Sequence, residues 1–243
     1  MIADIRTVIW KEWKEVLAWG GPRGRLGILM VPLVFGVFLP WQTGRAWVES
    51  PIALVYWAWV PLFLVSSVIA DAIAGERERH TLETLLASRL SNRAILLGKV
   101  AAAVGYGVGM SWLSLLLGLV TVNVAHGQGA LLLYPLAVGL GIVTFSVLGA
   151  SLAAAAGVLI SLRAATARQA QQTLSIATML LLFVPVFGLQ ALPQEWQARL
   201  FEILASMELM SLVFIVAAIL GCLTAGLLAV GMARFQRAQL ILD

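Results

Sequence analysis

The sequence ADAIAGERERHTLETLLASRLSNRAILLGK, residues Ala70–Lys99, separates two long apolar runs and holds more charge than any other part of the chain. Its charged residues are Asp71, Glu76, Arg77, Glu78, Arg79, Glu83, Arg89, Arg93 and Lys99. At a helical period of about 100° per residue, one side carries Leu82, Leu85 and Leu86, and the other carries Glu76, Arg79, His80 and Glu83. This pattern predicts a short amphipathic helix that lies against a surface.

Ion pairs within this helix are too weak to explain its charge. Glu76 with Arg79 and Arg79 with Glu83 have the spacing of helical neighbours, and each such pair is worth about 0.2–0.5 kcal/mol. Two interpretations follow from physics alone. The segment is either a solvated cytoplasmic loop whose arginines fix the orientation of the protein, or a surface on which another protein docks.

The composition indicates a polytopic membrane protein. The chain has 243 residues, of which 61% are hydrophobic and 12% charged, and its mean hydropathy is +0.96, which leaves too little polar surface to enclose its apolar content in water. The single cysteine, Cys222, lies in an apolar run, so the sequence predicts neither an internal disulfide nor a thiolate metal cluster.

Apolar runs predict an all-α fold of six transmembrane helices in one domain, 1–243. The first is short for a bilayer core of about 30 Å. The second precedes the charged stretch, and the third and fourth carry glycines that allow close helix approach. The expected spans are Leu26–Trp41, Pro51–Ala74, Ala94–Val124, Ala130–Ile160, Thr173–Leu192 and Leu209–Ala233.

Two further helices are expected to lie in the membrane plane. Residues 1–25 combine an amphipathic helix, with indoles at Trp10, Trp13 and Trp19, and a Gly/Pro breaker; charges that recur through Glu15 argue against a signal peptide. Residues 193–207 repeat Trp196, Leu200 and Leu204 on one face and predict a short external helix between spans five and six.

The basic residues indicate an orientation. Fourteen of the sixteen lysines and arginines fall on one predicted side, together with residues 75–92 and both termini, and only Arg45 and Arg199 fall on the other. Because short cytoplasmic loops are enriched in Lys and Arg, we expect both termini and residues 75–92 in the cytoplasm of a cell whose inner membrane holds this chain.

The charged stretch also resembles a known signature. A span that ends at an acidic residue, a Gly-Glu-Arg-x-x-x-Thr-Leu-Glu helix and a later Gly-Lys pair are similar to the pattern of ABC type-2 permeases, the membrane subunits of ATP-binding-cassette exporters. The chain departs from it at His80, where glycine is common, and at Arg89, where proline is usual. The matching positions are Asp71, Gly75, Glu76, Arg77, Arg79, Thr81, Leu82, Glu83, Leu86, Ser91, Gly98 and Lys99.

The resemblance implies a coupling helix that docks on a separate cytoplasmic ATPase, and a second permease, either another copy or a paralogue. The implied docking residues are Gly75, Glu76, Arg77, Arg79, Thr81, Leu82, Glu83 and Leu86. Asp71 and Lys99 are expected to be coupling or structural charges, and Asp71 is expected to pair with Lys99 or Arg93. A role of Asp71 in ion translocation is the alternative, because carboxylates at membrane depth are costly and often functional.

No motif predicts chemistry in the chain itself. There is no Gly-rich Walker loop, and His80 and His126 are expected on opposite sides of the membrane, so we expect no metal site, no catalytic residue and no cofactor. ATP and Mg²⁺ would bind the partner subunit, membrane lipids surround the chain, and no nucleic acid is expected as a partner.

The polar residues inside the predicted spans are uncharged, which favours export of an amphipathic or hydrophobic substrate over a bare ion. Two other functions fit a six-helix membrane protein. One is an ATP-independent secondary transporter or channel, which would need charged or coordinating groups at mid-membrane. The other is a structural subunit of a membrane complex. The identity of the substrate is not encoded in any motif of the sequence.

Overall fold

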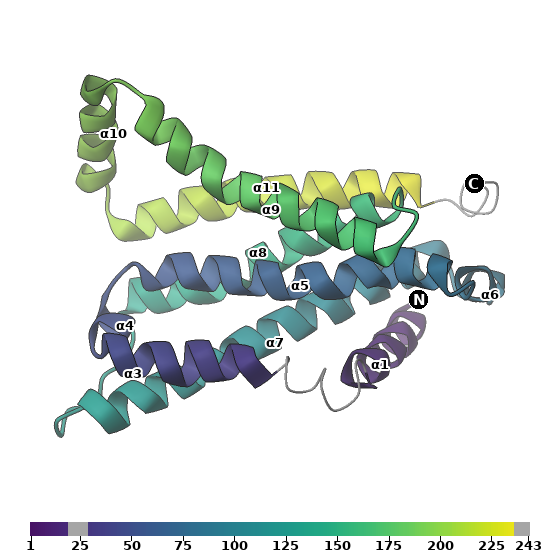
Figure 1. The fold of residues 1–243 in the computed structure, drawn as a ribbon, viewed down its shortest axis with the longest axis horizontal. Coiled ribbons are helices and arrows are strands. Elements are labelled where there is room, and N and C mark those ends of the chain that lie inside the picture. The colour runs from purple at the N-terminus through teal and green to yellow at the C-terminus, as the bar shows by residue number, and fades with distance from the viewer. Residues whose placement is uncertain (19–28, 236–243) are drawn as a thin grey trace.

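A computed structural model describes residues 1–18 and 29–235, and for Leu17, Ala18, Leu82, Glu83 and Leu86 it describes the backbone alone. The expected breaker at Gly20–Gly24, Trp19 and Arg237 lie outside the described residues. Within them, the secondary structure is helical (Figure 1). Five helices are long and apolar enough to cross a membrane: α5 (Ala53–Glu78), α7 (Asn92–His126), α8 (Leu136–Ser161), α9 (Ala167–Ala191) and α11 (Leu209–Arg234).

The all-α prediction is confirmed, and five of the six expected spans correspond to these helices. Within the described residues, the first expected span is a shorter helix, Leu29–Thr43, which includes a π-helical turn, η1 (Val34–Phe38), and ends in α3 (Leu39–Thr43). At 1.5 Å per residue it extends about 23 Å, less than a bilayer core of about 30 Å. A sixth complete span is therefore not established.

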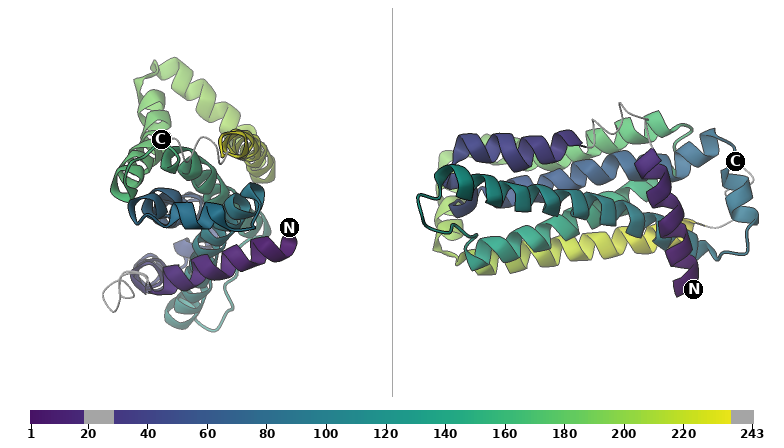
Figure 2. Two further views of the ribbon diagram at one scale, coloured as in Figure 1. Left: turned by 90° about the vertical axis from the view of Figure 1, so that its right-hand side faces the viewer. Right: turned by 90° about the horizontal axis from the view of Figure 1, so that it is seen from below.

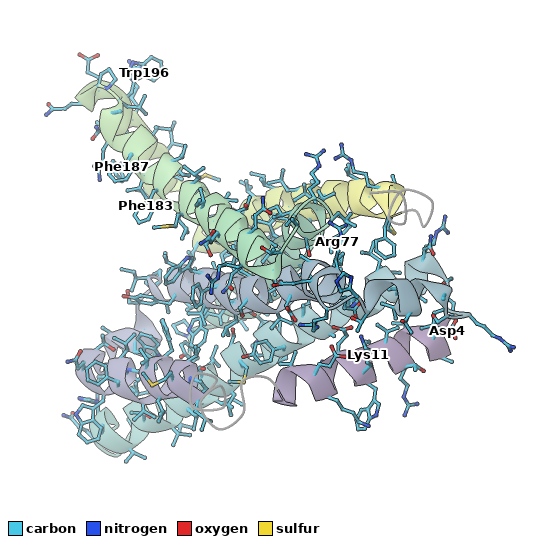
Figure 3. The ribbon with its side chains drawn as sticks, turned by 45° about the vertical axis from the view of Figure 1, so that its right-hand side comes forward. Asp4, Lys11, Arg77, Phe183, Phe187 and Trp196 are labelled. Atoms are coloured by element: carbon cyan, nitrogen blue, oxygen red, sulfur yellow. The ribbon has the colours of Figure 1, made fainter. Side chains whose placement is uncertain are left out.

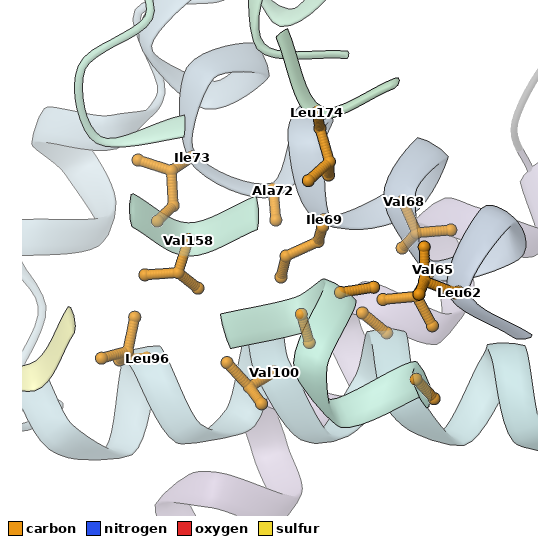
Figure 4. Close-up of a cluster of buried hydrophobic side chains, with 14 of the residues drawn as sticks. Leu62, Val65, Val68, Ile69, Ala72, Ile73, Leu96, Val100, Val158 and Leu174 are labelled. Atoms are coloured by element: carbon orange, nitrogen blue, oxygen red, sulfur yellow. The ribbon is translucent and has the colours of Figure 1, made fainter. Parts of the chain in front are cut away.

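Helix α5 is the centre of the bundle. It packs against α7, α8 and α9, and α8 in turn packs against α11. Val65, Ile69 and Ile73 of α5 are fully buried with side chains of α7 and α8 (Figure 4). Small residues allow this packing: a Cβ on Gly149 would lie 2.6 Å from the Ala58 carbonyl oxygen. Gly107 of α7 and Gly149 and Gly157 of α8 therefore lie at packing contacts with α5, as the sequence predicts, whereas Gly109 meets no neighbour within 4 Å.

The fourth span begins later than expected. The prediction began it at Ala130, but α8 starts at Leu136, after Pro135. The side chain of Asn123 donates to the carbonyl oxygen of Leu132 and accepts from its N–H, at 2.9 and 2.8 Å, so the non-helical segment 131–135 is bonded to the end of α7 at Leu132. A residue before proline disfavours the helical conformation, which explains the late start.

The molecule has two distinct ends. Helices α1 (Ile2–Ala18) and α6 (Leu82–Ala87), the α8–α9 connection and the end of α11 lie at one end, while α4 (Ala46–Glu49), the α7–α8 connection and α10 (Gln194–Ser206) lie at the other (Figure 1). We call these the α6 end and the α10 end. This arrangement agrees with the alternation of loops that the sequence predicts.

Helix α1 lies across the long helices instead of along them (Figure 2). It packs on α7 through Ile5, Val8 and Glu12, whereas Ile2, Trp10 and Trp13 are exposed. At the opposite end, α9 and α11 diverge toward α10 (Figure 1). No residue of α10 is buried, and its Trp196 side chain is exposed (Figure 3). The helix predicted at 193–207 thus exists, with Arg199 over the Trp196 ring at 5.9 Å.

Candidate functional site

The predicted amphipathic helix is divided into two parts. Helix α5 continues through Gly75 to Glu78, and α6 begins only at Leu82. His80 has a φ of 55°, and the Thr81 N–H donates to the Glu76 carbonyl oxygen at 2.9 Å while the His80 N–H donates to that of Arg77 at 3.0 Å. This is the Schellman arrangement that ends a helix. The expectation of one continuous helix from Gly75 to Leu86 is therefore corrected.

Four charges meet where α1 crosses α5 and α7. The Lys99 ammonium of α7 lies 2.7 Å from Glu12 of α1 and 3.0 Å from Glu76 of α5. Lys11 of α1 also donates to Glu76 and lies 3.3 Å from Glu15. Lys99 and Glu76 are each only 2% exposed, and Glu12 is 6% exposed. We call Lys11, Glu12, Glu76 and Lys99 the four-charge cluster; its formal charges cancel, as buried charges require.

The Gly-Lys pair of the sequence has a structural role in this cluster. Gly98 lies at the point where α1 approaches α7, because a Cβ there would be 2.6 Å from the Cβ of Val8. The next residue, Lys99, reaches both carboxylates. Gly98 thus allows the close approach of the two helices, and Lys99 fixes it.

The end of α5 is also bonded to α8 and α9. The guanidinium of Arg77 donates to the carbonyl oxygens of Ala164 and Leu162, at 2.9 and 3.1 Å, which follow the last turn of α8. Glu78 accepts from the Ala167 N–H, at 3.1 Å, at the start of α9. Buried Ser161 of α8 bonds the α5 backbone at two points. Arg77 and Glu78 therefore satisfy helix-terminal groups that the helices themselves leave unpaired.

The pairing of Asp71 differs from the prediction. Asp71 accepts two hydrogen bonds from the Arg79 guanidinium, at 3.1 and 3.2 Å, instead of pairing with Lys99 or Arg93. The chain reverses after Glu78 and turns Arg79 back along α5, whereas Lys99 is engaged by Glu12 and Glu76. The hydrogen bond to Asp71 raises the pKa of Arg79 above its ordinary value, against the effect of burial.

A cavity of about 410 Å³ lies beside the four-charge cluster, between α1, α5 and α7, and Asp71, Arg79 and Thr81 form part of its wall. Burial lowers the pKa of Lys11, but the hydrogen bond to Glu76 and the nearby carboxylates raise it further, so the net shift is upward. Glu12, Glu15 and Glu76 place carboxylate oxygens within 4.8 Å of one another. Because Lys11 and Lys99 already form ion pairs with all three carboxylates, we assign no metal ion to them.

The expected docking residues separate into two groups. Gly75, Glu76 and Arg77 face the interior of the bundle, where Glu76 and Arg77 hold other helices. Arg79 and Thr81 are exposed beyond the end of α5. Leu82, Glu83 and Leu86 belong to α6, and their side chains are outside the description. Glu76 therefore supports the segment from inside, and its expected position on the exposed polar face is corrected.

Sequence reasoning did not identify Lys11, Glu12, Glu78 or Ser161 as parts of this site. Glu12 gave one usable signal. It lies between Val8 and Val16 on the face that packs on α7, where an unpaired carboxylate would be costly, so it required a basic partner. The partner could not be named without the fold, because Glu12 and Lys99 are 87 positions apart.

The fold and this site define a multi-pass helical membrane protein whose helices are joined at the α6 end by ion pairs and hydrogen bonds. A family model described as ABC-2 family transporter protein matches residues 50–207, which include helices α5 to α10. The match covers more than half of the chain, and the chain therefore belongs to this family. The matched region is a membrane domain of a kind that is typically a permease without an ATPase domain. No curated protein sequence matches the chain.

Proposed function

We propose that this chain is the permease subunit of an ATP-binding-cassette exporter and that α6, with the exposed residues around it, docks on a separate cytoplasmic ATPase. One observation carries the proposal. The segment that the family signature marks projects at the end of the bundle, and its root is bonded to α1, α7, α8 and α9. A docking element needs such a root, because a flexible one would absorb the motion of its partner.

The proposal assigns the α6 end to the cytoplasm. Fourteen of sixteen Lys and Arg residues belong to that end by sequence, and the folded chain gathers α1, α6 and the end of α11 there (Figure 1). Juxtamembrane basic residues are retained on the cytoplasmic side. In this orientation both termini are cytoplasmic, α10 is external, and the protein is a multi-pass protein of the cell membrane.

The partners follow from the same proposal. ATP and Mg²⁺ bind the ATPase subunit, and a second permease, identical or paralogous, completes the transport pathway. Closure of the ATPases pushes α6 and, through the bonds at the end of α5, tilts α5 and α7 between inward-open and outward-open arrangements. Glu76 and Arg77 contribute by holding α6 in place, and the exposed residues contribute the contact.

The substrate class is amphipathic or hydrophobic. Hydroxyl groups within the long helices bond to carbonyl oxygens of their own helix, as Ser66 does to Leu62, Ser111 to Gly107 and Thr224 to Leu220, at 2.7–2.8 Å. These hydroxyl groups carry no charge and therefore offer a bare ion no counter-charge, which a lipid-like molecule does not need.

A charge reversal on α6 tests the docking role. We expect Glu83→Lys to weaken association with the cassette ATPase by about ten-fold, the effect of losing about 1.4 kcal/mol of contact. The ATPase is recovered with the chain from its native membranes, identified by peptide sequencing, and its binding is measured by titration against the purified permease. Substrate-stimulated ATP hydrolysis of the reconstituted pair gives the second readout.

Glu202→Lys is the matched control, because Glu202 is an exposed carboxylate on the amphipathic helix α10 at the opposite end. It should leave association unchanged. Equal effects of the two substitutions, or no effect of either, contradict docking at α6. Uptake or efflux that an ion gradient drives without ATP favours a secondary transporter. Absence of any transport with a bound ATPase favours a structural subunit.

A further inference from the structure

A second pocket lies at the α6 end, on the side of the bundle away from the four-charge cluster. Its volume is about 510 Å³, and it lies between the end of α8, the start of α9 and the end of α11. Helix α8 packs against both α9 and α11, so its last turn forms the floor and the other two helices form the walls. Its wall includes Arg163, Gln169, Thr173, Val230 and Arg234. We call it the two-arginine pocket.

The arginines of this pocket differ from the basic groups around the four-charge cluster and the end of α5. Lys11, Arg77, Arg79 and Lys99 each have an acidic or carbonyl partner. Within residues 1–18 and 29–235, no carboxylate forms an ion pair with Arg163 or Arg234. Glu78, which approaches from α5, accepts the Ala167 N–H. The pocket therefore presents two uncompensated guanidinium groups, which bind phosphate oxygens well.

Neutral groups in the pocket also favour an anion. Gln169 uses its side-chain oxygen to accept from the Ala165 N–H at 3.0 Å, which leaves its amide nitrogen as a donor. Thr173 adds a hydroxyl one turn further along α9. The start of α9, capped by Thr166, places the positive end of that helix dipole beside the pocket. These groups complement a negatively charged headgroup.

The apolar lining of the pocket and the apolar faces of α9 and α11 beside it favour a lipid as the source of this headgroup. Three apolar residues, Leu159, Ile160 and Val230, also line the pocket. Toward the middle of the long helices, the exposed side chains of α9 and α11 are apolar, among them Ile176, Met179, Ile219 and Leu223. A phosphate near the arginines would have its acyl chains along these faces, at the depth where the hydrocarbon of a bilayer lies.

We propose that the two-arginine pocket binds the headgroup of an anionic phospholipid from the leaflet at the α6 end. The lipid bridges α9 and α11, both of which pack on α8, and so holds together the base of two helices that diverge toward α10 (Figure 1). Binding is a property of this chain alone and does not involve the ATPase, so the outcome of its test is independent of the transport function proposed above.

Binding is measured on the full chain in neutral detergent, by thermal unfolding with added phosphatidylglycerol, phosphatidylcholine or glycerol 3-phosphate and by native mass spectrometry of retained lipid. We expect phosphatidylglycerol to raise the melting temperature more than phosphatidylcholine does, and glycerol 3-phosphate to have no effect. Arg163→Gln should weaken phosphatidylglycerol binding about five-fold, and Arg163→Gln with Arg234→Gln roughly thirty-fold. Arg163→Lys, which keeps the charge, should retain most of the affinity.

Arg168→Gln is the matched control, because Arg168 is an exposed arginine of the same segment that does not line the pocket. It should bind phosphatidylglycerol as the unaltered chain does. Equal loss in Arg168→Gln and Arg163→Gln overturns the proposal, because it shows attraction by general surface charge. Equal protection by phosphatidylcholine or by glycerol 3-phosphate also overturns it. So does a cross-link between Thr173→Cys of one copy and the same residue of a second, which would place protein in the pocket.

Discussion

His80 adopts a backbone conformation that glycine adopts more easily. Its φ of 55° is in the left-handed region, where a Cβ costs about 1–2 kcal/mol, and its position after the last turn of α5 is the one that glycine most often occupies in helix ends. The family pattern has glycine at this position. The departure in sequence therefore leaves the turn intact, and the turn retains the strain of a side chain.

Replacing His80 with glycine tests this account. The exposed His80 side chain makes no described hydrogen bond, so His80→Gly should raise the free energy of unfolding by about 1 kcal/mol, less a few tenths for the greater freedom of glycine in the unfolded chain. The measurement is thermal or denaturant unfolding in detergent micelles. Thr84→Gly, within the right-handed helix α6, should instead lower stability by a few tenths of a kcal/mol, about the difference in helix propensity between Thr and Gly. Equal destabilisation by both substitutions would refute the account.

The charged residues of the site could be identified from the sequence, but their ion-pair and hydrogen-bond partners could not. Asp71, Glu76 and Arg77 belong to the most highly charged stretch of the chain, and the resemblance assigns them to one signature. The sequence does not show that Arg77 reaches α8 while Arg79 turns back to Asp71, because the Schellman turn reverses the direction in which side chains point. Helical spacing alone predicted pairs along a continuous helix, which the structure does not contain.

At the scale of elements, α1 is held on the bundle by buried charge. Lys99 of α7 is bonded to Glu12 of α1 and to Glu76 of α5, so one side chain joins three helices. Removing one member of a buried ion pair is strongly destabilising, because the remaining charge has neither water nor a partner. The attachment of α1 therefore depends on all members of the four-charge cluster.

Lys99→Met should lower the free energy of unfolding by about 3–5 kcal/mol and release α1 from α7. Unfolding in detergent gives the stability, and the rate of tryptic cleavage within α1 gives the release. In a double-mutant cycle, the variant that carries both Glu12→Gln and Lys99→Met should lose less stability than the sum of the losses in the two single variants, because both members of the ion pair are removed together. Additive losses would show that Glu12 and Lys99 do not interact.

Helix boundaries were predictable where the composition changes sharply from apolar to polar. They were not predictable where hydrogen bonds to the backbone determine the first helical residue. The expected sixth span, Leu209–Ala233, differs from α11 by one residue. The fourth was placed six residues too early because residues 131–135 are not helical and Asn123 bonds the Leu132 backbone, an interaction that hydropathy does not reveal. Within its described part, the first is shorter than a full span. Its π-helical turn places Gly36 against α7, where a Cβ on Gly36 would lie 3.0 Å from the Ser114 carbonyl oxygen.

For the whole molecule, the gathering of basic residues at the α6 end predicts its sidedness. In a Cys222→Ala background, Ala198→Cys on α10 should react with a membrane-impermeant maleimide on intact cells, and Ala87→Cys on α6 should react only after permeabilisation. Both positions are exposed on short helices, so their reactivities are comparable. The reverse pattern would place α6 outside the cell and would remove the basis for an ATPase at that end.

The bonds at the root of α6 govern how a load would spread through the molecule. A lever that pivots freely loses its stroke at the hinge, but the last turn of α5 is tied to four other helices through Glu76, Arg77 and Glu78. Bending there alone would require several polar contacts to break at once, among them the buried ion pair between Glu76 and Lys99. A push at the tip would therefore be delivered to α1, α7, α8 and α9 together, and not to the last turn of α5 alone.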